Sequence, residues 1–261
     1  MKTNKLITAG FSIAVLALSL GSASALAQTS MWKVSKGNDY LYLGGTVHLL
    51  PESAFPLPAE FDAAYKATDT LVLETKMPEP TDTAAQTALM QAMAYSDGRS
   101  LSKVLSPEVY QQVSDYFTPY GVQLQQLDGY KPGFIMLQML ALEMMKAQIS
   151  GEGVDSHFDK RAKTDGKSLA YLETVESQIN LLANMGDGYE DAFMTMNLEQ
   201  FGDFKTYFTA MIAAWRAGDV AELNSLVVEP ARDLDPVLYQ ALFVARNKAW
   251  LPQIEQMFGN S

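Results

Sequence analysis

Runs of apolar residues divide the chain into a short β-rich part and a longer helical part. Residues 31–34 alternate apolar and polar, a Gly-Asn-Asp turn follows, and the run 40–43 comes next, which together predict a β-hairpin. Apolar runs at 70–73 and 168–172 predict two further buried strands. Residues 61–68 have helical spacing, so we expect a crossover that makes the strands at 40–43 and 70–73 parallel, with their carboxyl ends at one edge of the sheet.

Helical patterns dominate the rest of the chain. From about residue 80 to 165 we expect a large helical insertion, in which Ser106 and Pro107 begin one helix and residues 134–145 form another that is apolar on nearly every side. The methionines of the second helix favour a buried core; an adaptable pocket is the alternative. Residues 187–257 predict further helices. The predicted fold class is α/β, one domain over 28–261 with a small mixed β-sheet, flanking helices and the insertion.

The first 27 residues have the layout of a secretory signal peptide. Lys2 and Lys5 precede an apolar stretch, and small residues end at Ala27, where we expect cleavage. The apolar stretch is short for a membrane-spanning helix, and an uncleaved anchor is the alternative. We therefore expect this leader to lie outside the fold, and the mature chain from Gln28 to be periplasmic or secreted.

Charge and composition exclude several classes of function. The chain has 19 Lys and Arg residues against 30 Asp and Glu, a formal net charge of −11, and loss of the leader removes two lysines and no acid. A surface with this excess of negative charge repels phosphate backbones and anionic lipids. We therefore expect no nucleic-acid partner and no membrane contact beyond the leader. There is no cysteine, no Gly-x-Ser-x-Gly and no phosphate-binding glycine loop, which leaves little support for cysteine, serine or nucleotide chemistry.

Candidate chemistry gathers at the ends of two predicted strands. The run 40–43 leads into Gly44-Gly45 and then His48, and the run 70–73 ends in Glu74. Ligands commonly bind at the carboxyl ends of parallel strands, so both side chains are expected to face one cleft. A buried strand ends in an acid when that acid caps a helix, meets a cation or binds a metal. A loop-capping histidine and a salt bridge at the sheet edge are the alternatives for His48 and Glu74.

A second acid and a second histidine extend this set. The strand predicted at 168–172 ends in Glu173, which could point into the same cleft. His157 follows Asp155 by two residues in a polar helix, so the two would not share a helix face.

Several short motifs, in a fixed order along the chain, resemble those of the TraB/GumN family. They are Trp32, Gly45-Thr46-Val47-His48, the strand ending in Glu74, Gly153-Val154-Asp155, Leu172-Glu173-Thr174 and Arg246-Asn247. The family is related to the Tiki metalloproteases and, more distantly, to erythromycin-esterase-like proteins. The resemblance implies their α/β core with a helical insertion, and a divalent-metal site built from two Gly-x-x-His motifs and a strand-end glutamate.

Residue by residue, the resemblance assigns His48 and Glu74 as metal ligands and catalytic residues, with Arg246 and Asn247 as the matching Arg-Asn pair; Glu173 is a further catalytic candidate. The family's last strand, with the second Gly-x-x-His, has no counterpart before Ser261. We therefore expect either a fragment or a shortened member that has lost activity with the second histidine. His48 and two carboxylates could still hold manganese, cobalt or zinc and activate a water for hydrolysis.

The expected function is thus an exported metal-dependent hydrolase resembling a peptidase, acting on a peptide or a small molecule. The alternative is a non-catalytic periplasmic protein that binds a ligand or peptide and regulates. Convergence of His48 with the carboxylates would favour the first.

Overall fold

The computed structural model describes residues 5–10, 29–76, 81–149 and 151–258, with 5–10 described as backbone only. Five strands form one sheet in the order β2-β3-β1-β4-β5. Their bounds are β1 (Lys5–Gly10), β2 (Met31–Lys36), β3 (Asp39–Thr46), β4 (Thr70–Leu73) and β5 (Ser168–Tyr171). β2 and β3 pair antiparallel, whereas β1 is parallel to β3 and β4, and β5 is parallel to β4. The sheet is small and mixed, as predicted.

The hairpin and the crossover are confirmed. β2 and β3 meet at a turn in which Gly37 has a φ of +63°, a left-handed conformation that glycine adopts without strain. Helix α1 (Ala59–Lys66) connects β3 to β4 and buries Phe61 and Tyr65 against the sheet. The strands β3 and β4 run in the same direction, and their carboxyl ends share one edge.

The leader departs from our expectation. We expected residues 1–27 to lie outside the fold, but Lys5–Gly10 form β1 in the interior of the sheet, between β3 and β4. The physical reason is that β3 and β4 each present a backbone edge to the space between them, and an extended segment there satisfies the N–H and C=O groups of both. The rest of the predicted leader lies outside the described residues.

The helical insertion follows β4. Its helices are α2 (Thr83–Ala92), α3 (Leu101–Val104), α4 (Pro107–Phe117), α5 (Pro132–Lys146) and α6 (Val154–Asp165). Ser106 caps α4 as predicted, because its side chain accepts a hydrogen bond from the Val109 N–H. In α5, Met139 and Met144 are buried in the main core and Met136 is partly buried against it, whereas Met145 is 66% exposed. The predicted burial is therefore confirmed for Met139 and Met144 and is wrong for Met145.

The remaining helices follow β5. They are α7 (Val175–Ala183), α8 (Glu190–Gly202), α9 (Phe204–Ala217), α10 (Val220–Leu223), α11 (Glu229–Leu234), α12 (Pro236–Tyr239) and α13 (Ala245–Gln256). Asp219 caps α10, because its side chain accepts a hydrogen bond from the Glu222 N–H. No helix in the described part of the chain is both long and apolar enough to cross a bilayer.

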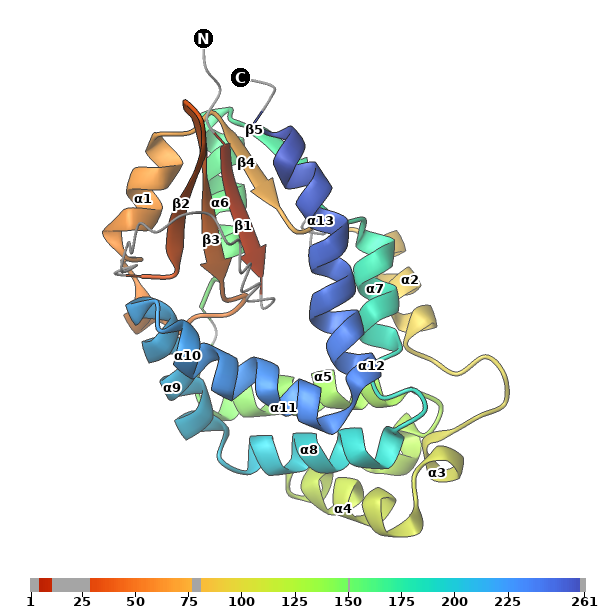
Figure 1. Ribbon diagram of the computed structural model, residues 1–261. Helices are drawn as coiled ribbons and strands as arrows, with labels where there is room; N and C mark the ends of the chain where they lie inside the picture. Colours follow the sequence, from red (N-terminus) through yellow and green to blue (C-terminus); the bar gives the residue numbers. More distant parts are fainter. Residues whose placement is uncertain (1–4, 11–28, 77–80, 150, 259–261) are drawn as a thin grey trace.

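Different helices cover the two faces of the sheet. On one face, Leu71 and Leu73 join the main core with residues of α1 and α6, including Phe158. On the other face, Leu41 and Val72 pack in a separate small core with Trp250 of α13, together with Leu172. Figure 1 shows the strands β1, β3 and β4 pointing toward a layer of helices that includes α5, α8 and α11. The carboxyl ends of these strands therefore face the helical part of the molecule, next to α13.

Candidate functional site

The glycine pair at the end of β3 allows close packing. A Cβ at Gly44 would lie 3.3 Å from the Phe61 ring and 2.8 Å from the flexible end of Met31. The Gly45 carbonyl accepts a hydrogen bond of 2.7 Å from the Trp215 indole N–H of α9. The backbone is thus fixed just before the loop that carries His48.

His48 is hydrogen-bonded to Asp155. The His48 Nδ1 and the Asp155 Oδ2 are 2.7 Å apart. A carboxylate only accepts hydrogen bonds, so Nδ1 carries the proton and Nε2 is left available. The Asp155 side chain is 6% exposed, whereas the His48 side chain is 54% exposed. The histidine is therefore oriented from behind by a buried acid and presents its other nitrogen to the surroundings.

The start of α6 is pressed against the end of β3, which brings this pair together. The Val154 N–H donates to the Val47 carbonyl at 2.9 Å. A Cβ at Gly153 would lie 2.0 Å from the His48 carbonyl oxygen, so only glycine fits here. Asp155 lies in the first turn of α6, directly behind the imidazole. The sequence reasoning missed this partner, although the Gly153-Val154-Asp155 motif pointed to the segment.

The environment of His48 favours its protonated form. Desolvation by the surrounding protein lowers the pKa of His48, but the hydrogen bond and the charge of Asp155, with the charge of Glu74, outweigh that effect and raise the pKa above the usual 6.5. The charge of His48 in turn lowers the pKa of Glu74. The two strand-end residues are thus close enough to interact electrostatically, as the predicted shared cleft requires.

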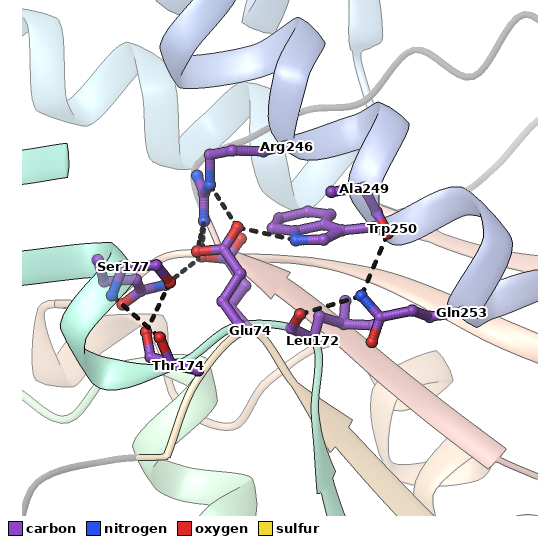
Figure 2. Close-up of polar contacts among 10 residues, drawn as sticks. Glu74, Leu172, Thr174, Ser177, Arg246, Ala249, Trp250 and Gln253 are labelled. Carbon is purple, nitrogen blue, oxygen red and sulfur yellow. Dashed lines mark hydrogen bonds and ion pairs between the residues drawn. The ribbon is translucent and has the colours of Figure 1, made fainter. Parts of the chain in front are cut away.

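Arg246 of α13 joins the two strand-end glutamates. Its guanidinium donates to Glu74 Oε2 at 2.8 Å and to Glu173 Oε1 at 2.7 Å. All three side chains are largely buried, with exposed fractions of 6% for Glu74, 12% for Glu173 and 15% for Arg246. Figure 2 shows Arg246 reaching from its helix toward Glu74. The salt-bridge alternative for Glu74 is therefore correct for one of its two oxygens.

The other oxygen of Glu74 is free. Glu74 Oε1 is buried and has no hydrogen-bond partner among the residues that the structure describes. Burial raises the pKa of Glu74 to about 7, although the charges of Arg246 and His48 lower it. A buried carboxyl that titrates near neutral pH, with one unpaired oxygen, is unusual in a purely structural salt bridge and is common at functional sites.

Further side chains complete this network, and the sequence reasoning missed their roles. The Trp250 indole N–H donates to Glu173 Oε1 at 2.8 Å, and the Arg246 guanidinium lies 4.7 Å from the Trp250 ring centroid. The Gln178 amide donates to Glu74 Oε2 at 3.2 Å. Trp250 lies four residues after Arg246, one helical turn away, and that spacing was the available signal.

Other buried polar atoms without partners occur at the same strand ends and on α13. They are Thr46 Oγ1 at the end of β3, Thr75 Oγ1 just after β4, and Asn247 Oδ1 next to Arg246. Buried polar groups are normally hydrogen-bonded, so such atoms at the carboxyl edge of a sheet are free to bind water or a ligand. Asn247 directly follows Arg246, and its side-chain oxygen has no hydrogen-bond partner within the described part of the chain.

The structure separates one predicted candidate from the rest. The His157 Nδ1 lies 3.5 Å from Glu152 Oε2, and the His157 ring packs at a tilt against Phe55, with ring centroids 5.3 Å apart. It does not face His48, in agreement with the prediction that Asp155 and His157 lie on different faces of the helix. The structure therefore gathers His48, Glu74, Glu173 and Arg246 and leaves His157 outside.

The fit to a divalent metal is partial. Two features suit one: His48 donates Nδ1–H to a carboxylate, as metal-binding histidines do, and Glu74 Oε1 is free. Within the described ranges, however, no three side chains of ligand type are placed to hold a metal ion. Arg246 occupies both oxygens of Glu173 and so withdraws the third expected ligand. Two protein ligands alone make a weak site.

Comparison with known proteins supports the family resemblance. No curated protein and no solved structure gave a significant match. The model of the TraB/PrgY/gumN family matches residues 30–261, which include every residue of the site and exclude β1. Because this match covers most of the chain, the protein belongs to the TraB/PrgY/gumN family.

Proposed function

We propose that the strand-end site is a hydrolytic centre that activates water, with His48 as general base and Glu74 as general acid. The observation that carries the proposal is a histidine oriented by a buried carboxylate beside a glutamate whose pKa lies at about 7. An acid and a base with pKa values near the working pH are what proton transfer needs.

Each group has a stated role. Asp155 holds the His48 ring with Nδ1 protonated, so Nε2 accepts a proton from water, as in other histidine–carboxylate pairs. Glu74 Oε1 is unpartnered and can donate a proton to a leaving group. Arg246 holds Glu74 through Oε2 only, which fixes the carboxyl group while it leaves Oε1 free. Asn247 positions substrate through its unused side-chain oxygen. The substrate class is a peptide or a small molecule with a hydrolysable bond.

A divalent cation, manganese, cobalt or zinc, gives an alternative form of this proposal, in which His48 Nε2 and Glu74 Oε1 would hold the cation instead of transferring protons. When bound, the cation would lower the pKa of a water molecule. Asp155 and Arg246 would then orient the ligands from behind. We also propose that the α/β fold of this chain is the one found in the Tiki and erythromycin-esterase-like proteins.

Hydrolysis of a library of quenched fluorescent peptides tests the function. The full chain is assayed with EDTA and with each of Mn²⁺, Co²⁺ and Zn²⁺. We expect turnover that falls by about 10²-fold or more in both His48→Gln and Glu74→Gln, because each removes one proton-transfer group. His157→Gln is the matched control and is expected to retain activity, because that side chain lies outside the site. Equal turnover in the wild type and both site variants would refute the proposal.

A second function is favoured by a different observation. Arg246 forms ion pairs with both Glu74 and Glu173, and Trp250 donates a further hydrogen bond to Glu173. Such a network holds the carboxylates in place and leaves them less available for proton transfer. Such a site would bind a ligand without turning it over. If calorimetry detects a peptide that binds the wild type and is recovered intact, the protein is a binding or regulatory module.

Export belongs to the proposal as well. The layout of residues 1–27 supports cleavage after Ala27 and release into a periplasm. Expression in a bacterial host, followed by fractionation and N-terminal sequencing, tests it; an N-terminus at Gln28 in the periplasmic fraction is expected, and a full-length cytoplasmic chain would contradict it.

A further inference from the structure

The position of β1 in the sheet is unusual for its place in the sequence. Lys5 lies opposite both Leu41 of β3 and Thr70 of β4, and the parallel register continues to Gly10 opposite Thr46. β1 therefore has a hydrogen-bonded neighbour on each side. Strands in the interior of a parallel sheet usually belong to the conserved core of a domain, because they are covered on both faces.

β1 nevertheless comes from a part of the chain whose sequence pattern predicts removal. It lies within the predicted leader, and cleavage after Ala27 would separate it from all the other strands. It also lies outside residues 30–261, the part that matches the family model. The sheet position between β3 and β4 is thus filled by a segment that neither the family match nor the exported chain would include.

We propose that the space between β3 and β4 is a peptide-binding groove, that Lys5–Gly10 is its occupant in this chain, and that this strand can be exchanged for a free extended peptide. The groove recognises its peptide by parallel backbone pairing on two sides, a form of strand addition. The backbone edges of β3 and β4 provide the hydrogen bonds, and they are held in place by residues such as Leu71 and Val72, which are fully buried.

The register defines the kind of peptide that fits. The present occupant reads Lys-Leu-Ile-Thr-Ala-Gly: six residues without proline, with small residues at the carboxyl end. The last two positions of β1 lie opposite Gly45 and Thr46 of β3. Backbone pairing on both sides needs an amide N–H in the middle of the peptide, so we expect the groove to take extended peptides that lack proline.

The groove leads to the site already described. The last residue of β1 is level with Thr46, two residues before His48, and Thr8 is level with Leu73, the residue before Glu74. A peptide in the groove therefore ends between the two strand-end residues. The placement of a peptide next to His48 and Glu74 rests on the proposed function. Binding of the peptide in the groove does not depend on catalysis.

Disulfide crosslinking tests whether β1 occupies the groove in solution. The chain has no cysteine, so Ile7→Cys combined with Leu43→Cys introduces a single pair at positions that are direct neighbours in register. Neighbouring strands bring such positions within the range that a disulfide spans. The matched control combines Ile7→Cys with Tyr40→Cys, which is three residues out of register. The full chain is made by cell-free translation, where no export machinery removes the leader.

We expect the in-register pair to oxidise almost completely and the control pair to remain reduced. Equal crosslinking of both pairs, or none in either, would overturn the assignment of Lys5–Gly10 as the occupant.

Exchange is tested on the folded full chain with a protease site inserted after Ala27. After cleavage, a fluorescent peptide of residues 3–12 is added, and its binding is measured by anisotropy. The control peptide carries proline at position 7, which removes a backbone donor in the middle of the strand. We expect the labelled peptide to replace the cleaved leader and to bind about 100-fold more tightly than the proline peptide.

Two outcomes would refute the exchange. If the leader dissociates and the remainder stays folded but binds no peptide, the groove is not a binding site. If the remainder unfolds when the leader dissociates, β1 is a fixed core strand and not an exchangeable one. The readout is binding alone, so a failure of the hydrolytic proposal would leave this result unaffected.

Discussion

The raised pKa of Glu74 makes a quantitative prediction about stability. Burial raises this pKa from 4.5 to about 7 in the folded protein. Between these two pH values, the folded state holds a proton that the unfolded chain has lost, so the free energy of unfolding falls as the pH rises from 4.5 through 7. Each pKa unit corresponds to about 1.4 kcal/mol, so the full loss is about 3 kcal/mol, and most of it falls between pH 5 and pH 8.

Glu74→Gln removes this titration and keeps the shape of the side chain. The assay is urea unfolding of the wild type and the variant at pH 5, 6, 7 and 8, with the free energy of unfolding taken from the midpoint and slope. We expect the variant to gain about 2–3 kcal/mol relative to the wild type between pH 5 and pH 8. Glu199→Gln makes the same chemical change at an exposed position and is expected to follow the wild type at every pH.

The reasoning is refuted by a constant difference between wild type and Glu74→Gln across this pH range. That result would mean that Glu74 is fully ionised in the folded protein and that Arg246 compensates its burial completely. The free oxygen of Glu74 would then have no role as a proton donor. A difference of the opposite sign would show that the ion pair outweighs burial.

Three further predictions follow from the site. Asp155→Asn is expected to lower the pKa of His48, because the hydrogen bond and the charge of the Asp155 carboxylate no longer raise it; NMR titration of the two histidines measures this pKa, and an unchanged value would contradict the pairing. Arg246→Met leaves two buried carboxylates without their counter-charge and is expected to cost about 3–5 kcal/mol in urea unfolding, whereas a surface-like cost below 1 kcal/mol would refute the burial argument. Gly153→Ala forces a Cβ into the backbone at His48 and is expected to destabilise by about 1–3 kcal/mol, while the control Gly202→Ala, which meets only open space, is expected to be neutral within 0.5 kcal/mol.

The sequence by itself determined the local elements and the strand-end residues. Alternation and turn residues predicted the hairpin of β2 and β3, and helical spacing predicted the α1 crossover that makes β3 and β4 parallel. Parallel strands end at one edge, so His48 and Glu74 could be placed together from sequence alone. The burial of Ile135 and Met139 in α5 was also predictable, because a largely apolar helix buries most of its surface, although Met145 near its end is exposed.

Only the tertiary structure decided which partners these residues have. Asp155 lies 107 positions from His48, and Arg246 lies 172 positions from Glu74, so no local pattern could pair them. Packing of α6 at Gly153, and of α13 across the sheet, brings these groups into contact. The sequence could not predict the position of Lys5–Gly10 in the sheet for the same reason. A leader pattern is recognised from composition, whereas the pairing of an extended segment between two strands depends on the sheet that surrounds it.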